Sequence, residues 1–114
     1  MPSDFIEDYS FGSVIIDGKN YTDDVILLDE KVISTWWRKI GHRVVIEDLN
    51  EVIDHDPDVL IIGTGSSGRM KVPAELSKRL DMVVESYPTG EACKRYNELF
   101  KKDRKIAGAF HITC

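Results

Sequence analysis

The sequence predicts an α/β domain in which an N-terminal antiparallel β meander packs on, or extends, a parallel βαβαβ unit. Short apolar strands alternate with amphipathic helical segments over residues 59–112, which is the pattern of two consecutive βαβ units. Before them, segments rich in β-branched residues are separated by turn residues, as in a meander. A length of 114 residues suits one domain, taken as residues 1–114.

The first half of the chain contains three strand candidates. They cover residues 11–16, 21–28 and 32–37. Asp17-Gly18 follows the first of them, and this dipeptide is a strong signal for a tight hairpin turn. Residues 1–10 precede the meander and are a candidate for a loosely ordered N-terminal segment.

The second half alternates helices and strands. Apolar residues at helical spacing predict a short helix over residues 47–54, which ends before Pro57. A fully apolar strand follows at residues 59–62, and Pro73 suits the first turn of the next helix. Thr89 is expected to cap a longer helix with one apolar stripe. The remaining strands are predicted at residues 82–85 and 105–112, so residues 59–112 supply a three-stranded parallel core.

Composition excludes several classes of protein. A net charge of −5 argues against a nucleic-acid binder, because phosphate contacts need an excess of Lys and Arg. The sequence has no apolar run near the roughly 20 residues that a membrane span requires. Its acidic start differs from a basic signal or transit peptide, which predicts an unprocessed protein with a cytoplasmic location. Two cysteines without a C-x-x-C spacing indicate neither a disulfide framework nor a metal site.

The best candidate pocket is the glycine-rich loop made by Gly63, Thr64, Gly65, Ser66, Ser67 and Gly68. It follows a buried strand at the carboxyl end of the predicted sheet, where α/β proteins bind ligands, and it matches G-x-G-x-x-G. Pro73 delays the next helix by several residues, so the helix N-terminus that a pyrophosphate needs is missing. Two interpretations remain: a small anion held by the loop with Thr89, or a turn that needs glycine geometry.

Other polar residues carry weaker signals. Asp23 and Asp24 could form a paired-carboxylate site, but acids beside a hairpin are commonly surface residues. His111 and Cys114 fall on opposite faces of a strand, so His111 is expected to be a structural, hydrogen-bonded histidine. Cys93 is expected to be a small core residue. The sequence contains no recognisable catalytic constellation, which favours a protein that is not an enzyme and uses no cofactor.

Four ordered motifs resemble those of the Mth-domain family of small, mostly uncharacterised archaeal and bacterial proteins. They lie at residues 11–21, 60–65, 89–97 and 111–114, the last reading His-Ile-Thr-Cys. The family also includes the mitochondrial complex I assembly factor three and the adipogenesis-associated Mth-domain protein. The resemblance implies a β layer packed on an α/β unit and brings no established reaction or cofactor.

The assembly role of the eukaryotic relatives favours a non-enzymatic protein-binding or assembly-assisting module, by analogy. Trp36 and Trp37 are candidate interface residues, because exposed tryptophans often anchor partners, although core packing of at least one is equally compatible with the sequence. The alternative is a small anionic ligand-binding protein or enzyme with its pocket at residues 63–68. The sequence leaves the partner and the oligomeric state open.

Overall fold

The centre of the molecule is a five-stranded mixed sheet. The computed structural model describes residues 4–36, 38, 43–102 and 105–113. The strand order is β5-β4-β8-β6-β7. The strands are β4 (Val25–Leu28), β5 (Lys31–Ser34), β6 (Val59–Thr64), β7 (Val83–Tyr87) and β8 (Ile106–His111). Strand β6 pairs in parallel with both β7 and β8, whereas β4 is antiparallel to β8 and β5. The predicted α/β class and the three-stranded parallel core are therefore confirmed.

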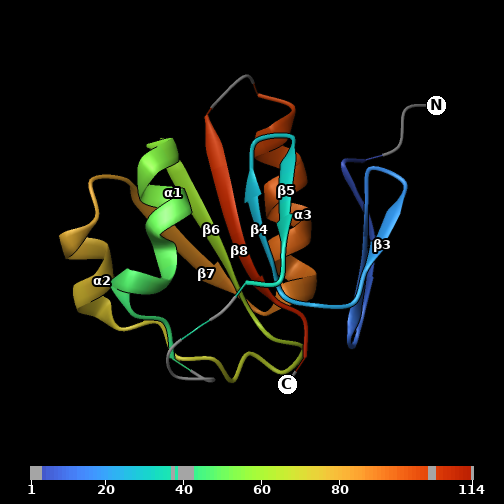
Figure 1. Ribbon diagram of the computed structural model, residues 1–114, viewed down its shortest axis with the longest axis horizontal. Coiled ribbons are helices and arrows are strands. Elements are labelled where there is room, and N and C mark those ends of the chain that lie inside the picture. The colour runs from blue at the N-terminus through green and yellow to red at the C-terminus, as the bar shows by residue number, and fades with distance from the viewer. Residues whose placement is uncertain (1–3, 37, 39–42, 103–104, 114) are drawn as a thin grey trace.

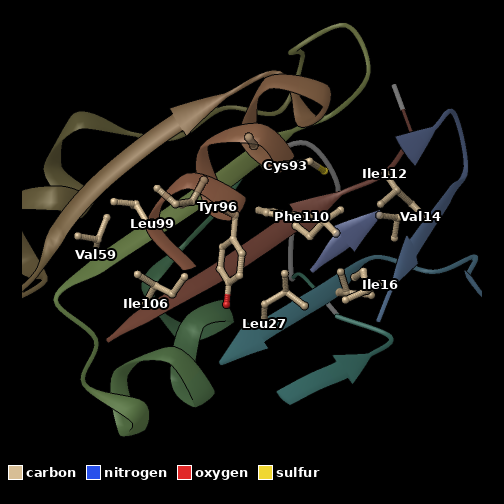
Figure 2. Packing of buried hydrophobic residues seen from close by; sticks show 14 residues of the cluster. Val14, Ile16, Leu27, Val59, Cys93, Tyr96, Leu99, Ile106, Phe110 and Ile112 are labelled. Atoms are coloured by element: carbon tan, nitrogen blue, oxygen red, sulfur yellow. The ribbon is translucent and has the colours of Figure 1, made fainter. Parts of the chain in front are cut away.

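A smaller antiparallel sheet lies beside it (Figure 1). It contains β1 (Ile6–Ser10), β2 (Ser13–Ile16) and β3 (Lys19–Tyr21) in that order. Its buried residues Val14 and Ile16 belong to the same apolar cluster as Leu27, Tyr96 and Phe110 (Figure 2). The meander is thus divided, since β1–β3 pack on the α/β unit while β4 and β5 extend its sheet.

One expectation for the first half was wrong. The strand predicted over residues 21–28 is broken, because β3 ends at Tyr21 and β4 begins at Val25 in the other sheet. Asp24 lies at this break, and its carboxylate binds groups at the end of β8. Within the segment 1–10, residues 6–10 form β1, and Asn97 binds both backbone polar groups of Ile6.

Helices cover both faces of the large sheet (Figure 1). One face contacts η1 (Ile46–Leu49), α1 (Asn50–His55) and α2 (Ala74–Arg79), and the other contacts α3 (Thr89–Phe100) and the small sheet. Helix α1 ends before Pro57 as predicted, with Asp56 in the left-handed conformation at φ 53°. None of the helices in the described residues has the length and apolar character needed to cross a bilayer.

Candidate functional site

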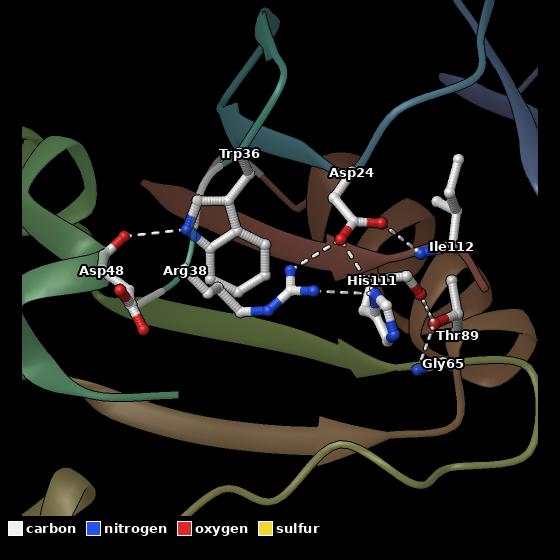
Figure 3. Close-up of polar contacts among 8 residues, drawn as sticks. All are labelled: Asp24, Trp36, Arg38, Asp48, Gly65, Thr89, His111 and Ile112. Carbon is white, nitrogen blue, oxygen red and sulfur yellow. Dashed lines mark hydrogen bonds and ion pairs between the residues drawn. The ribbon is translucent and has the colours of Figure 1, made fainter. Parts of the chain in front are cut away.

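A buried polar cluster connects the end of β8 to the start of β4 (Figure 3). Asp24 lies directly before β4, and His111 is the last residue of β8. Asp24 Oδ1 accepts a hydrogen bond from the Ile112 amide at 2.8 Å. Its second oxygen lies 2.8 Å from His111 Nδ1 and 2.6 Å from Arg38 Nη1. One carboxylate therefore joins three segments that are far apart in the sequence.

The His111 ring nitrogen Nδ1 faces one hydrogen-bond acceptor and one donor. Arg38 Nη2 lies 3.1 Å from it, in addition to Asp24 Oδ2. A protonated Nδ1 donates to the carboxylate, whereas a bare Nδ1 accepts from the guanidinium, because one ring nitrogen cannot do both. The tautomer of the His111 ring thus decides which of the two neighbours Nδ1 binds.

The carboxyl group of Asp24 is held in its ionised form. Burial favours the neutral form, but hydrogen bonds from the Ile112 amide, His111 and Arg38 outweigh it and lower the pKa of Asp24 from 3.8. The side chains of Asp24 and Arg38 are 15% and 8% exposed, so this ion pair is largely shielded from solvent. The expectation that Asp24 is a surface acid beside a turn was wrong, whereas Asp23 is exposed.

Trp36 supports the cluster from the other side (Figure 3). The Arg38 guanidinium lies 4.8 Å from the centre of the indole ring, a cation–π contact. The indole Nε1 donates to the Asp48 carbonyl at 2.8 Å, and the side chain is 7% exposed. The structure thus places Trp36 in the core instead of at a partner surface, because a buried indole N–H finds an internal acceptor here. Trp37 lies outside the described residues.

Thr89 connects this cluster to the glycine loop. Its hydroxyl donates to the His111 carbonyl at 2.5 Å and accepts from the Gly65 amide at 2.8 Å. Thr89 is fully buried as the first residue of α3, and the N-cap is Pro88 instead of the expected Thr89. The hydroxyl cannot cap the helix because it bridges two strand ends.

The glycine loop makes many hydrogen bonds within the protein. The Ser66 amide donates to the Thr113 carbonyl, and the Gly68 amide donates to the Gly65 carbonyl. A Cβ at Gly63 would lie 2.9 Å from Thr89 Oγ1, so Gly63 is needed for close packing. Gly65 and Gly68 have φ values of 102° and 70°. Backbone geometry and packing therefore account for these three glycines, and the amides of Gly65, Ser66 and Gly68 already bind internal acceptors.

The remaining loop residues divide between core and surface. Thr64 is buried and its hydroxyl donates to the Tyr87 carbonyl at 3.0 Å, whereas Ser66 and Ser67 are exposed. Gly63, Thr64, Gly65 and Thr89 lie around one junction of β6, β8 and α3. A small-anion site at this loop stays a prediction.

Two clefts lie between β1 and α3. The first has a volume of about 540 Å³ and is lined by Asp4, Ile6, Glu7, Asp8, Tyr9, Ser66, Pro88, Gly90, Glu91, Cys93, Lys94 and Asn97. The second, of about 900 Å³, is lined by Asp4, Phe5, Glu7, Asp17, Gly18, Glu30, Asn97, Phe100 and Lys101. Because they share Asp4, Glu7 and Asn97, the clefts are neighbours, and we call them together the β1–α3 face.

The cysteine and histidines in the described residues lie in the core or contact acidic side chains. Cys93 is a buried core residue, and burial raises the pKa of its thiol to about 12. His111 is buried and hydrogen-bonded, as predicted. His55 Nε2 lies 2.9 Å from Asp29 Oδ2, a partner that the sequence did not reveal. In the ranges that the structure covers, no group of three or more His, Cys, Asp or Glu side chains could hold a metal ion. His42 and Cys114 lie outside those ranges.

A family model described as "Protein of unknown function (DUF498/DUF598)" matches residues 6–111. The chain belongs to this family. The family match and the solved structures below agree with the resemblance to Mth-domain proteins seen in the sequence motifs.

Solved structures support the membership of the DUF498/DUF598 family. A conserved hypothetical protein from Pyrococcus horikoshii is 31% identical with a TM-score of 0.85, covering 96% of this chain and 98% of the other. The protein MT938 is 32% identical with a TM-score of 0.81 and the same coverage. A Mth938-like domain from Bordetella pertussis is 16% identical with a TM-score of 0.70, covering 98% and 89%, and shows the fold alone.

Proposed function

We propose that this domain is a non-enzymatic protein-binding or assembly-assisting module. The observation that carries the proposal is that polar backbone groups at the carboxyl ends of β6 and β8 make hydrogen bonds within the protein. In α/β sheets these ends usually bind ligands. Here the amides of Gly65 and Ser66 and the carbonyl of His111 bind Thr89 and Thr113. The strand ends are therefore held together by internal contacts.

The surface that stays open favours contact with another protein. The β1–α3 face combines two clefts with Phe100, which is 36% exposed. Phe11 is 68% exposed at the β1–β2 turn and lies next to Gly12, whose amide donates to the Ile112 carbonyl. An exposed aromatic side chain that lines a cleft, as Phe100 does, is a typical anchor of protein interfaces. We also propose a cytoplasmic location, which the free thiol of Cys93 supports.

A small anionic ligand at residues 63–68 is the second candidate function. Ser66 supports it, because this exposed residue lies at the end of β6 and lines the 540 Å³ cleft. The carboxylates of Asp4, Glu7 and Glu91 line the same cleft and oppose an anion electrostatically. The protein-binding function is therefore preferred.

The two functions can be separated by photo-crosslinking and ligand screening. A photoreactive phenylalanine analogue placed at Phe100 should crosslink a protein partner in native cells. The same analogue at Ile53, which is 38% exposed on α1, is the matched control and should not. A thermal-shift screen with phosphate, nucleotides and carboxylates should leave the melting temperature unchanged. Stabilisation by one of these anions, abolished by Gly65→Asp, together with no crosslink at Phe100, would overturn the proposal.

A further inference from the structure

We infer that the partner of the β1–α3 face is a protein segment that combines Lys or Arg with apolar side chains. This inference rests on the proposed protein-binding function and names the chemistry of the partner. Two independent features of the face support it: the sign of the charges at the rim and the aromatic floor. Together they describe a site for an amphipathic basic segment of another protein.

The rim of the face has a strong excess of negative charge. Six carboxylates line the two clefts, and they belong to Asp4, Glu7, Asp8, Asp17, Glu30 and Glu91. The cations lining the same clefts are Lys94 and Lys101. Lys101 Nζ lies 3.0 Å from Asp4 Oδ1, and Glu7 accepts a hydrogen bond from the Gly18 amide. The carboxylates still outnumber the lysines, so the lining of the clefts is negative, which favours a cationic segment.

The floor of the larger cleft is aromatic. The rings of Phe5 and Phe100 are stacked with centres 4.5 Å apart and an angle of 8° between their planes. Tyr96 extends this stack into the core, with its ring centre 6.3 Å from that of Phe100. A guanidinium or an apolar side chain can stack on the exposed side of such a pair. Charge alone would attract any cation, whereas the aromatic floor favours a segment that also carries apolar groups.

The backbone beneath the face is fixed, so the site is preformed. Asn97 Oδ1 accepts from the Ile6 amide and Asn97 Nδ2 donates to the Ile6 carbonyl, both at 2.9 Å. Asn97 is 8% exposed and thus connects β1 to α3 from inside. Since this contact holds β1 against α3, a partner segment does not have to order these two elements on binding.

Fluorescence anisotropy with three labelled peptides tests the inference. The first peptide alternates Lys and Phe, the second carries Glu in place of Lys, and the third carries Ser in place of Phe. The first peptide should bind the wild-type chain, and its affinity should fall at high salt. It should bind the Asp8→Lys/Glu30→Lys variant about tenfold less tightly. Both positions are exposed, so the fold is kept, as melting temperatures will verify. Glu51→Lys, exposed on α1, is the matched control and should bind like the wild type.

Three outcomes would overturn the inference: equal binding of the acidic peptide, equal binding by the double variant, or no binding of the basic peptide at low salt. If the peptide without Phe binds as tightly as the Lys–Phe peptide, the claim that the partner segment needs apolar side chains is wrong. Sequencing the partner segment crosslinked at Phe100 separates this inference from the proposed function. A crosslinked segment without basic residues contradicts the inference alone, and a second copy of this chain would make the face a self-association surface instead. No crosslink would contradict the proposed function itself.

Discussion

Asp24 and His111 are 87 positions apart in the chain, yet Asp24 Oδ2 lies 2.8 Å from His111 Nδ1. This contact fixes the start of β4 against the end of β8, two strands that pair antiparallel. The same carboxylate also contacts Arg38 and the Ile112 amide. Asp24 therefore connects the start of β4 to the end of β8 at this end of the large sheet.

The variant Asp24→Asn should lower the free energy of unfolding by about 1–3 kcal/mol at neutral pH, because the charged Arg38 guanidinium loses its ion pair with the Asp24 carboxylate. The pKa of Asp24 is lowered on folding, so its stabilising effect is present above the unfolded value and is lost as pH falls through the folded pKa. The difference between wild type and variant should thus shrink as the pH falls below the unshifted pKa of 3.8 and through the lowered pKa of the folded protein. Urea unfolding at several pH values measures it.

Asp23→Asn is the matched control, because Asp23 is exposed and lies 3.4 Å from Thr35 Oγ1. It should change stability by less than about 0.5 kcal/mol at any pH. A difference between wild type and Asp24→Asn that stays constant with pH would contradict the role given to the Asp24 carboxylate.

Thr89→Val should destabilise the protein by about 2–4 kcal/mol, because it removes a hydroxyl that binds two buried backbone groups while keeping the shape of the side chain. Thr89→Ser keeps the hydroxyl and should cost less than about 1.5 kcal/mol, the range for losing one buried methyl group. Chemical denaturation of both variants is the measurement. A loss on Thr89→Val that is no larger than the loss on Thr89→Ser would contradict the bridging role given to the hydroxyl.

Gly63→Ala should destabilise the fold by about 1–3 kcal/mol through overpacking. The added Cβ would lie 2.9 Å from Thr89 Oγ1 and 3.2 Å from Phe110 Cδ1, both on buried residues. Gly90→Ala, inside α3, is the control: its Cβ would lie 3.9 Å from the Tyr9 ring, so it should stabilise by about 0.5–1 kcal/mol. Melting curves of the two variants should therefore shift in opposite directions, and a neutral Gly63→Ala would contradict the packing argument.

Asn97→Ala should release β1 from α3. It removes both hydrogen bonds to Ile6, so backbone amides of residues 6–10 should exchange with solvent faster than in the wild type, while those of β6 and β8 change less. Hydrogen–deuterium exchange with mass spectrometry gives the comparison. Asn20→Ala, exposed on β3, is the control and should leave the exchange pattern unchanged. Protection of β1 that survives Asn97→Ala would contradict this role.

The sequence predicted the parallel part of the fold well, because its signals are local. The apolar run of β6 and the stripe of α3 lie on consecutive residues, and each periodicity reports its own element. The division between the two sheets was not predictable in the same way. Residues 22–24 look like an ordinary polar turn, and nothing local says that the chain moves to another sheet there.

The candidate site shows the same contrast. The glycine loop and Thr89 were chosen as candidate site residues from the G-x-G-x-x-G motif and from their positions after a predicted strand and at the start of a predicted helix. The partnership of Asp24 with His111 and Arg38 was missed, since an acid beside a turn is read as a surface residue. The sequence by itself determined the fold class, the parallel core and the family, because these depend on local patterns. Only the tertiary structure decided that Asp24 is shielded and ionised and that the rim of the β1–α3 face is acidic, because charges distant in sequence meet only after folding.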